Sequence, residues 1–230
     1  MKKYRTILFD LDGTLLNTIE DLAASVNHVM RTYGQPEHSV DAVRQMVGNG
    51  VRTLMKRAIP EGEACPTFEE EVALQKEYYL THCRVATEPF DGIIPLLQEC
   101  KNRGIMTAVV SNKDHPAVRE LCYYFFKDLI TESVGNGEGR RVKPYPDSCY
   151  EAMMRLAADK AGTLYVGDSE VDAQTAANAG IDCVLVSWGF RSRELLEQQD
   201  AVAVVDKPEE LLAFVPERKI FSQLLYTNPV

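Results

Sequence analysis

Residues 6–15 read TILFDLDGTL, and this stretch decides the fold. It begins with a short apolar, β-branched run and turns polar at Asp10 and Asp12, just before Gly13. An apolar run without alternation is typical of a strand buried on both faces, as in a parallel sheet. The sequence contains further runs of the same kind, at residues 105–110, 163–166, 183–186 and 201–205. We therefore expect a parallel sheet with residues 6–9 as its first strand.

Helical patterns alternate with the later strands. Apolar residues recur at helical spacing in residues 93–101, 117–126, 147–158 and 172–179. The last of these segments stops at Gly180, a typical signal for the C-terminus of a helix. Strands that alternate with helices predict an α/β fold with a doubly wound, Rossmann-like parallel sheet.

Residues 18–84 break this alternation, because they contain no convincing strand. Thr18 to Asp21 read as a capping box that starts a helix, and apolar residues at helical spacing continue that helix to Gly34. Further helical patterns cover residues 40–47, 51–59 and 68–83. The sequence therefore predicts an all-helical block inserted after the first strand.

These patterns set the expected domain boundaries. Residues 17–85 would form a helical cap, and residues 1–16 and 86–230 would form the α/β core. The sequence leaves open whether the tail after Pro216 packs on that core.

Composition excludes several classes of protein. The chain has 230 residues, of which 45% are hydrophobic, which is enough for a real core and excludes wholesale disorder. Lys and Arg total 25 against 34 Asp and Glu, and the formal net charge of -9 argues against nucleic acid as a partner. The six cysteines form no C-x-x-C pair, and no apolar stretch approaches the ~20 residues of a membrane helix. We expect a cytoplasmic protein without membrane contact.

Three expected strands end in residues whose side chains can take part in catalysis or binding, namely Asp10, Ser111 and Asp168. In an open parallel sheet, ligands bind outside the carboxyl ends of the strands. These three positions are far apart in sequence, but such a sheet would bring them to one site.

Paired carboxylates suggest the chemistry of that site. An aspartate such as Asp10 can act as a nucleophile, and a second carboxyl at Asp12 can exchange protons with the leaving oxygen and with water. Asp168 and Asp172 form another acidic pair, and clustered carboxylates repel one another unless a cation joins them. Oxygen ligands suit Mg²⁺. Lys143 would add a positive charge, as a lysine near a phosphoryl group does.

The motifs that carry this chemistry resemble those of the haloacid dehalogenase superfamily of hydrolases. The matching segments are DLDGTL at 10–15, SNK at 111–113, KP at 143–144 with PD at 146–147, and GDSEVD at 167–172. They occur in the family's order, and a helical cap after the first strand also matches. Within the superfamily, the chain looks most like the phosphoglycolate phosphatases. Asn17-Thr18 departs from the Asp-Ser or Asp-Thr of many relatives, which loosens this finer assignment.

The resemblance implies a role for each matching residue. Asp10 would be the nucleophile and Asp12 the general acid and base, whereas dehalogenases lack an aspartate at the latter position. Lys143 would steady the nucleophile and the phosphate. Mg²⁺ would be held by Asp10, the backbone carbonyl of Asp12, and Asp168, with Asp172 assisting. The phosphoryl group would be bound by Gly13, Thr14, Ser111 and Asn112.

The cap contributes a weaker candidate site. Gly48, Asn49 and Gly50 stand between two expected helices, and Arg52 follows them. Backbone N–H groups at the start of the second helix could bind the anionic end of a substrate. A plain helix–helix turn is an equally good interpretation, and Arg52 could equally be surface charge.

The sequence thus predicts a Mg²⁺-dependent phosphatase acting on a small phosphorylated metabolite, with 2-phosphoglycolate as the first expectation from the resemblance. We expect a monomer or a weak homodimer. Alternatives stay open on the same fold: a phosphomutase resembling β-phosphoglucomutase, a pyrophosphatase or a 5′-nucleotidase. A phosphate-binding interaction protein without activity is the non-enzymatic alternative.

Overall fold

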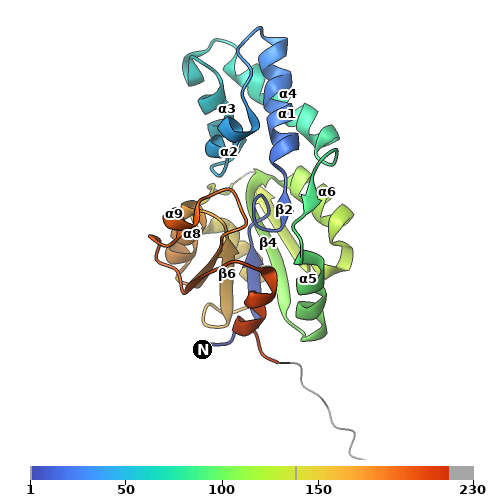
Figure 1. The fold of residues 1–230 in the computed structure, drawn as a ribbon, viewed down its shortest axis with the longest axis vertical. Helices are drawn as coiled ribbons and strands as arrows, with labels where there is room; N and C mark the ends of the chain where they lie inside the picture. The colour runs from blue at the N-terminus through green and yellow to red at the C-terminus, as the bar shows by residue number, and fades with distance from the viewer. Residues whose placement is uncertain (1, 138, 218–230) are drawn as a thin grey trace, which may run out of the picture.

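The centre of the fold is a six-stranded parallel sheet (Figure 1). The computed structural model describes residues 2–137 and 139–217. The strands run in the order β5-β4-β1-β6-β7-β8, and every neighbouring pair is parallel. Their bounds are β1 Thr6–Phe9, β4 Met106–Asp114, β5 Glu132–Asn136, β6 Thr163–Gly167, β7 Asp182–Val186 and β8 Ala203–Val205. The predicted α/β fold is confirmed.

Helices cover both faces of this sheet. Alternate residues of β1 point to opposite faces, with Ile7 and Phe9 in one apolar cluster and Leu8 in the other. The first cluster includes residues of α5 (Ile93–Asn102), α6 (His115–Phe125) and the 3-10 segment η3 (Pro208–Phe214). The second includes residues of α7 (Asp147–Arg155), α8 (Glu170–Ala179) and α9 (Arg193–Leu196). Burial on both faces explains why the strand sequences are continuously apolar.

The edge strand β5 was not predicted from the sequence. Its residues, ESVGN at 132–136, include a glycine and polar residues at both ends, and only Val134 and Gly135 are buried. An edge strand pairs on one side only, so its sequence carries a weaker apolar signal than that of a central strand. Whether the tail after Pro216 packs on the core is a question that falls largely on residues 218–230, which lie outside the described part of the chain.

A block of helices stands above the carboxyl ends of the strands (Figure 1). It contains α1 (Ile19–Thr32), α2 (Val40–Met46), α3 (Val51–Ala58), the 3-10 turn η1 (Gly62–Ala64) and α4 (Phe68–His82). The chain enters this block through β2 (Leu16–Asn17) and leaves it through β3 (Glu88–Pro89), and these two short strands pair antiparallel. We call this helical block the cap.

The expected capping box at the start of α1 is wrong. The Thr18 side chain makes no capping hydrogen bond, and its hydroxyl donates instead to Asp12 Oδ1 at 2.6 Å. The side chain of Asp21 turns to the returning chain. A capping box does form at α8, between Ser169 and Asp172.

Asp21 joins the two chain crossings between the cap and the core. Its buried carboxylate accepts hydrogen bonds from the N–H groups of Val85, Ala86 and Thr87 at 2.9–3.1 Å and from the Thr87 hydroxyl at 2.7 Å. The first turn of α1 is therefore tied to the segment that leads into β3. A carboxylate suits this position, because it accepts several hydrogen bonds and donates none.

Substitution Asp21→Asn tests this connection. The amide has only one acceptor oxygen, so donors of residues 85–87, of which Thr87 is buried, lose their acceptor, and we expect a loss of about 1–3 kcal/mol in the free energy of unfolding. Urea denaturation measures it. The control is Asp41→Asn, whose side chain is 84% exposed and ion-paired at the surface, and its expected change is within about 0.5 kcal/mol. Equal effects of the two substitutions would contradict the role of Asp21.

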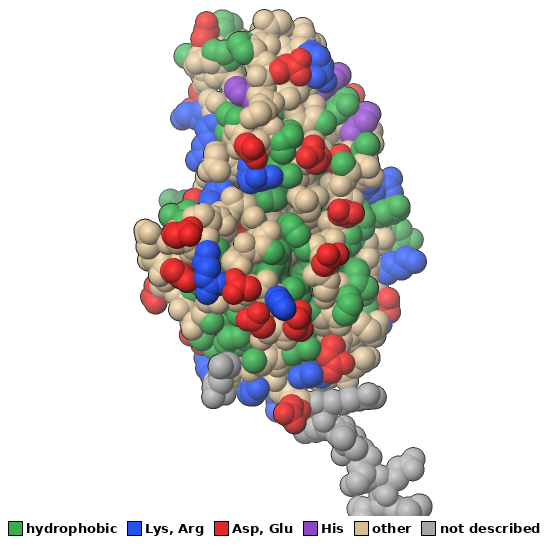
Figure 2. Space-filling view, in the orientation of Figure 1, with side chains coloured by type: hydrophobic (Ala, Val, Ile, Leu, Met, Phe, Trp, Pro, Cys, Tyr) green, Lys and Arg blue, Asp and Glu red, His purple; other side chains and the backbone are tan. Residues whose placement is uncertain are grey.

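Two properties of the molecule bear on membranes and on charge fields, the character of its helices and the side chains on one face of its surface. Among the described residues, no helix combines the length and the apolar character that crossing a bilayer requires. On the face shown in Figure 2, acidic and basic side chains are interspersed.

Candidate functional site

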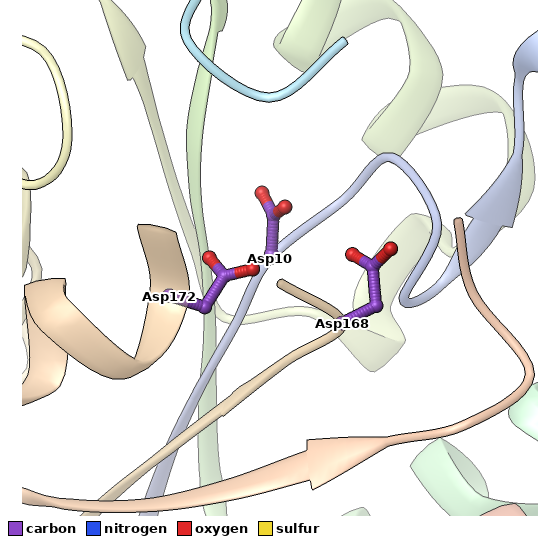
Figure 3. Close-up of side chains that lie close together, drawn as sticks. All are labelled: Asp10, Asp168 and Asp172. Carbon is purple, nitrogen blue, oxygen red and sulfur yellow. The ribbon is translucent and has the colours of Figure 1, made fainter. Parts of the chain in front are cut away.

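The carboxyl ends of β1, β4 and β6 meet beneath the cap, as expected from the strand order. Asp10 directly follows β1, Ser111 lies near the end of β4, and Asp168 directly follows β6. All three line a cavity of about 380 Å³, and residues of the cap also line it. Figure 3 shows Asp10, Asp168 and Asp172 grouped at this edge of the sheet. Residues far apart in sequence therefore form one site.

The buried ammonium of Lys143 lies between two of these carboxylates, Asp10 and Asp172. Its Nζ is 2.8 Å from Asp10 Oδ1 and 2.8 Å from Asp172 Oδ1. The Lys143 side chain is only 2% exposed. Burial lowers the pKa of Lys143, but the carboxylates of Asp10 and Asp172 outweigh it and hold that pKa above its ordinary value. Lys143 therefore stays charged.

Asp172 holds Lys143 and has little capacity left for another ligand. Its Oδ1 accepts hydrogen bonds from Lys143 Nζ and from the Tyr165 hydroxyl at 3.1 Å. Its Oδ2 accepts from the Ser169 N–H at 3.1 Å and the Ser169 hydroxyl at 2.6 Å. A carboxylate has about four lone-pair sites. Asp172 is thus suited to positioning the lysine, and Tyr165 is a site residue that sequence reasoning missed.

Asp168 is fixed by close packing of glycines. Its Oδ2 accepts from the Phe190 N–H at 2.7 Å, and its Oδ1 accepts from the Thr14 hydroxyl at 3.2 Å. Gly13 has φ +85°, and a Cβ there would lie 2.4 Å from Asp168 Oδ2. A Cβ at Gly189 would lie 2.3 Å from the Asp168 Cβ. Gly13 and Thr14 therefore contact Asp168, and the Gly13 N–H already donates to Leu16 O at 2.9 Å.

The acidic cluster fits a divalent cation. Asp10, Asp168 and Asp172 each offer an oxygen, and these oxygens lie within 4.8 Å of one another. Asp10 Oδ1 is buried and accepts no hydrogen bond, although it is ion-paired with Lys143. Three buried carboxylates face one ammonium, so the cluster carries an excess of negative charge. Since Asp172 is fully engaged, Asp10 and Asp168 are the better ligands.

Burial and mutual repulsion raise the pKa values of two carboxyls in this cluster, Asp10 and Asp168. Burial raises the pKa of Asp10 well above its usual range, the Lys143 ammonium opposes that rise, and the carboxylates of Asp172 and Asp168 add to it. Burial, reinforced by the charge of Asp172, raises the pKa of Asp168 to about 7. Without a bound cation these carboxyls therefore keep their protons to a higher pH than exposed carboxyls do.

Asp12 lies in the same cavity but has different partners. Its Oδ1 accepts from the Thr18 hydroxyl and is 3.1 Å from Lys113 Nζ. Lys113 Nζ also donates to the Tyr79 hydroxyl of α4 at 2.8 Å. The carboxyl of Asp12 is therefore connected to the cap by one lysine. Lys113 belongs to the segment SNK at 111–113, but no role was predicted for it from the sequence.

Ser111 and Asn112 reach the cavity, as expected. Asn112 Nδ2 donates to Lys143 O at 3.1 Å and to Gly48 O at 3.0 Å, and its Oδ1 accepts from the Lys143 N–H at 2.6 Å. Ser111 is buried, and its hydroxyl accepts from the Lys113 N–H at 3.2 Å. Asn112 thus connects the segment around Lys143 to residues 47–50 between α2 and α3, which we call the cap loop.

The structure brings together only part of the expected cap site. Gly48 and Gly50 line the cavity. Asn49 is absent from the lining, and its side-chain oxygen accepts from Arg57 at 2.9 Å. Arg52 does not line the cavity either, because its guanidinium is 54% exposed and pairs with Glu69 at 2.8 Å and with Glu63 at 3.4 Å. Arg52 is surface charge, the alternative that the sequence left open.

Arg191, which sequence reasoning missed, is the arginine at the cavity. It follows β7, and its side chain is 9% exposed. Its Nη1 donates to Arg44 O at 3.2 Å, and its Nη2 donates to Val47 O at 2.8 Å. Its Nε donates to Glu170 Oε2 at 3.1 Å. A core arginine therefore binds the carbonyls at the end of α2 and positions the cap loop that follows.

Known proteins resemble this chain along most of its length. The family model described as haloacid dehalogenase-like hydrolase matches residues 7–186. A phosphoglycolate phosphatase of Thiobacillus denitrificans is 31% identical, over 92% of this chain and 95% of its own length. Phosphoglycolate phosphatase 1 of Pseudomonas aeruginosa is 29% identical, over 90% and 78%. A solved structure from Lactobacillus delbrueckii subsp. bulgaricus, provisionally named a phosphoglycolate phosphatase, has a TM-score of 0.88 and 33% identity and covers 94% of this chain and 100% of that chain.

Substitution Arg191→Met tests the attachment of the cap loop. It keeps the apolar stem but removes two hydrogen bonds to the cap, each worth about 1 kcal/mol. We expect faster hydrogen exchange at residues 44–50 and a tenfold to roughly thirtyfold loss of kcat/KM for phosphate release. Arg193→Met, which removes exposed ion pairs with Glu197 and Asp206, is the matched control. Identical exchange in the two variants would show that Arg191 does not hold the loop.

Substitution Asp168→Asn tests the raised pKa of the Asp168 carboxyl. A carboxyl whose folded pKa is about 7 binds a proton in the folded state that the unfolded state has lost, so it makes the protein less stable as pH rises. With metal removed by a chelator, we expect the free energy of unfolding of the wild type to fall between about pH 4 and 7. The fall relative to the variant should be on the order of 1 kcal/mol per pH unit. Urea denaturation across this range measures the difference, and parallel curves for the two proteins would refute it.

Proposed function

The chain belongs to the haloacid dehalogenase-like hydrolase family, and on that premise we propose that it is a magnesium-dependent phosphatase whose substrate is 2-phosphoglycolate. The observation that carries the proposal is the buried group of Asp10, Lys143, Asp168 and Asp172 at the carboxyl edge of the sheet. The relatives named phosphoglycolate phosphatases, which match most of the chain, support the choice of substrate.

Asp10 is the proposed nucleophile. One of its oxygens attacks the phosphorus atom, and the bond from phosphorus to the alcohol oxygen breaks, which leaves an aspartyl phosphate. Lys143, held by Asp172, keeps Asp10 in place and supplies positive charge next to the incoming phosphoryl group. Asp10 and Asp168 would hold Mg²⁺, with the backbone carbonyl of Asp12 as a further ligand by family resemblance. When bound, the ion supplies charge neutralisation for the phosphate.

Asp12 is the proposed general acid and base. It lines the same cavity as Asp10, so a proton on its carboxyl can pass to the leaving alkoxide as the first bond breaks. The ionised Asp12 then takes a proton from a water molecule that attacks the phosphorus. The bond between Asp10 and phosphorus breaks, phosphate leaves, and both carboxyls return to their starting states.

The cap is proposed to comprise residues 17–85 and to complete the site. The loop that carries Gly48 and Gly50 is held to the core by Asn112 and Arg191. The first N–H groups of α3 lack partners within that helix, and they would bind the carboxylate of 2-phosphoglycolate. Closure over Asp10 would exclude bulk water while the aspartyl phosphate forms.

Phosphate release from a panel of small phosphomonoesters, with and without Mg²⁺, tests this proposal. We expect release that requires the metal, is fastest for 2-phosphoglycolate, and falls to background in Asp10→Asn, because an amide is a poor nucleophile. The panel includes sugar phosphates, pyrophosphate and nucleoside monophosphates.

Several outcomes would contradict it. Near wild-type release by Asp10→Asn would exclude the nucleophile, and metal-independent release would exclude the metal. Isomerised sugar phosphate without free phosphate would indicate a phosphomutase. Ligand binding without turnover would indicate a phosphate-binding interaction protein.

A further inference from the structure

The cavity above Asp10 is larger than a two-carbon phosphate ester requires. Its volume is about 380 Å³, within the roughly 300–1,000 Å³ of pockets that enclose drug-sized ligands. In the proposed mechanism the phosphoryl group would occupy the end of the cavity beside Asp10 and Lys143. The remainder of the cavity, between the cap and α6, is available to the alcohol part of a substrate.

Six apolar residues form part of the lining of this cavity. The cap contributes Leu22 of α1, Val51 and Leu54 of α3, and Leu80 of α4, and the core contributes Pro116 and Ala117 of α6. We call these six residues the apolar wall. Leu22 and Leu54 also belong to the main hydrophobic core, which fixes their positions. Leu80 is 43% exposed, so a ligand could cover apolar surface that water now contacts.

The charged side chains that line the cavity do not attract a second anionic group, and the carboxylate site proposed at the start of α3 depends on backbone N–H groups instead. In the part of the chain that the structure describes, each lining cation outside the Asp10 cluster already has a carboxylate partner. Lys113 pairs with Asp12 at 3.1 Å, Lys76 pairs with Asp114 at 2.9 Å, and Arg191 pairs with Glu170 at 3.1 Å. The carboxyl of Glu77 also belongs to a lining residue. An uncharged, apolar group is the better match.

We propose that the site also hydrolyses phosphomonoesters whose alcohol carries an apolar body of several carbons. The inference rests on the proposed phosphatase function and adds a substrate class to it. The phosphoryl group lies against Asp10, and the apolar body lies against the apolar wall. The bonds that form and break are those proposed above, and the proton from Asp12 goes to the larger leaving alcohol.

A series of n-alkyl phosphates tests this proposal. Each methylene that is buried on the apolar wall contributes about three- to fourfold in binding. We expect kcat/KM to rise by that factor per carbon from ethyl to butyl to hexyl phosphate. A flat or falling series, with 2-phosphoglycolate still hydrolysed, would overturn this inference and leave the proposed function intact.

A charge placed on the apolar wall gives the complementary test. Leu80→Asp should lower the ratio of kcat/KM for hexyl phosphate to that for ethyl phosphate at least tenfold. The matched control is Met154→Asp on α7, a side chain that is 74% exposed and outside the cavity lining, and it should keep the wild-type ratio. An unchanged ratio in Leu80→Asp would count against the apolar wall.

The two proposals can fail separately. If no substrate releases phosphate, the proposed function is wrong, and calorimetric titration of the alkyl phosphates then decides the inference. Affinity that rises with chain length would support an apolar binding site, and affinity independent of chain length would refute it.

Discussion

The burial of one lysine among three carboxylates is the constraint on which the rest of the site depends. Lys143 touches both Asp10 and Asp172, and all of these groups lie almost wholly out of water. Charges removed from water cost free energy unless their partners are well placed. The site therefore needs a rigid frame, and a parallel sheet provides one, because its strands place Asp10 and Asp168 from a buried backbone. The excess negative charge of the ionised carboxylates is a cost to the apo protein, and a divalent cation would balance it and allow an anionic phosphoryl group to approach.

Local sequence makes this convergence sterically possible. The chain must pass very close to the Asp168 carboxylate on two sides, at Gly13 and at Gly189, and neither position has room for a Cβ. The indole N–H of Trp188 donates to Thr14 O at 3.0 Å and so ties the loop after β7 to the loop after β1. The loops at the edge of the sheet are thus packed against one another, and the acidic groups have few alternative positions.

Much of this could be predicted from the sequence, because strand-end motifs combine with a repeating pattern. The apolar runs and their terminal residues identified the sheet, and the sheet placed Asp10, Ser111 and Asp168 together. Tyr165, Arg191 and the edge strand β5 were missed for a different reason. Tyr165 reads as one more apolar strand residue, and its hydroxyl matters only because Lys143 and Asp172 lie beside it. No sequence pattern tells whether Arg191 or Arg52 lies at the cavity, because that depends on how the cap packs on the core.

The two ends of the cavity hold the substrate by different interactions, charged groups near the sheet and apolar side chains near the cap. Toward the sheet, Asp10 and Asp172 share the ammonium of Lys143, and small displacements of Asp10 or Lys143 would be costly. Toward the cap, the cavity is lined by side chains that interact without direction, such as Leu54 and Leu80. A site built this way fixes the phosphoryl group strictly and the remainder of the substrate loosely. The core then sets the chemistry, and the shape of the cap sets the range of alcohols that can leave. Arg191 and Asn112 hold the cap loop in place above Asp10.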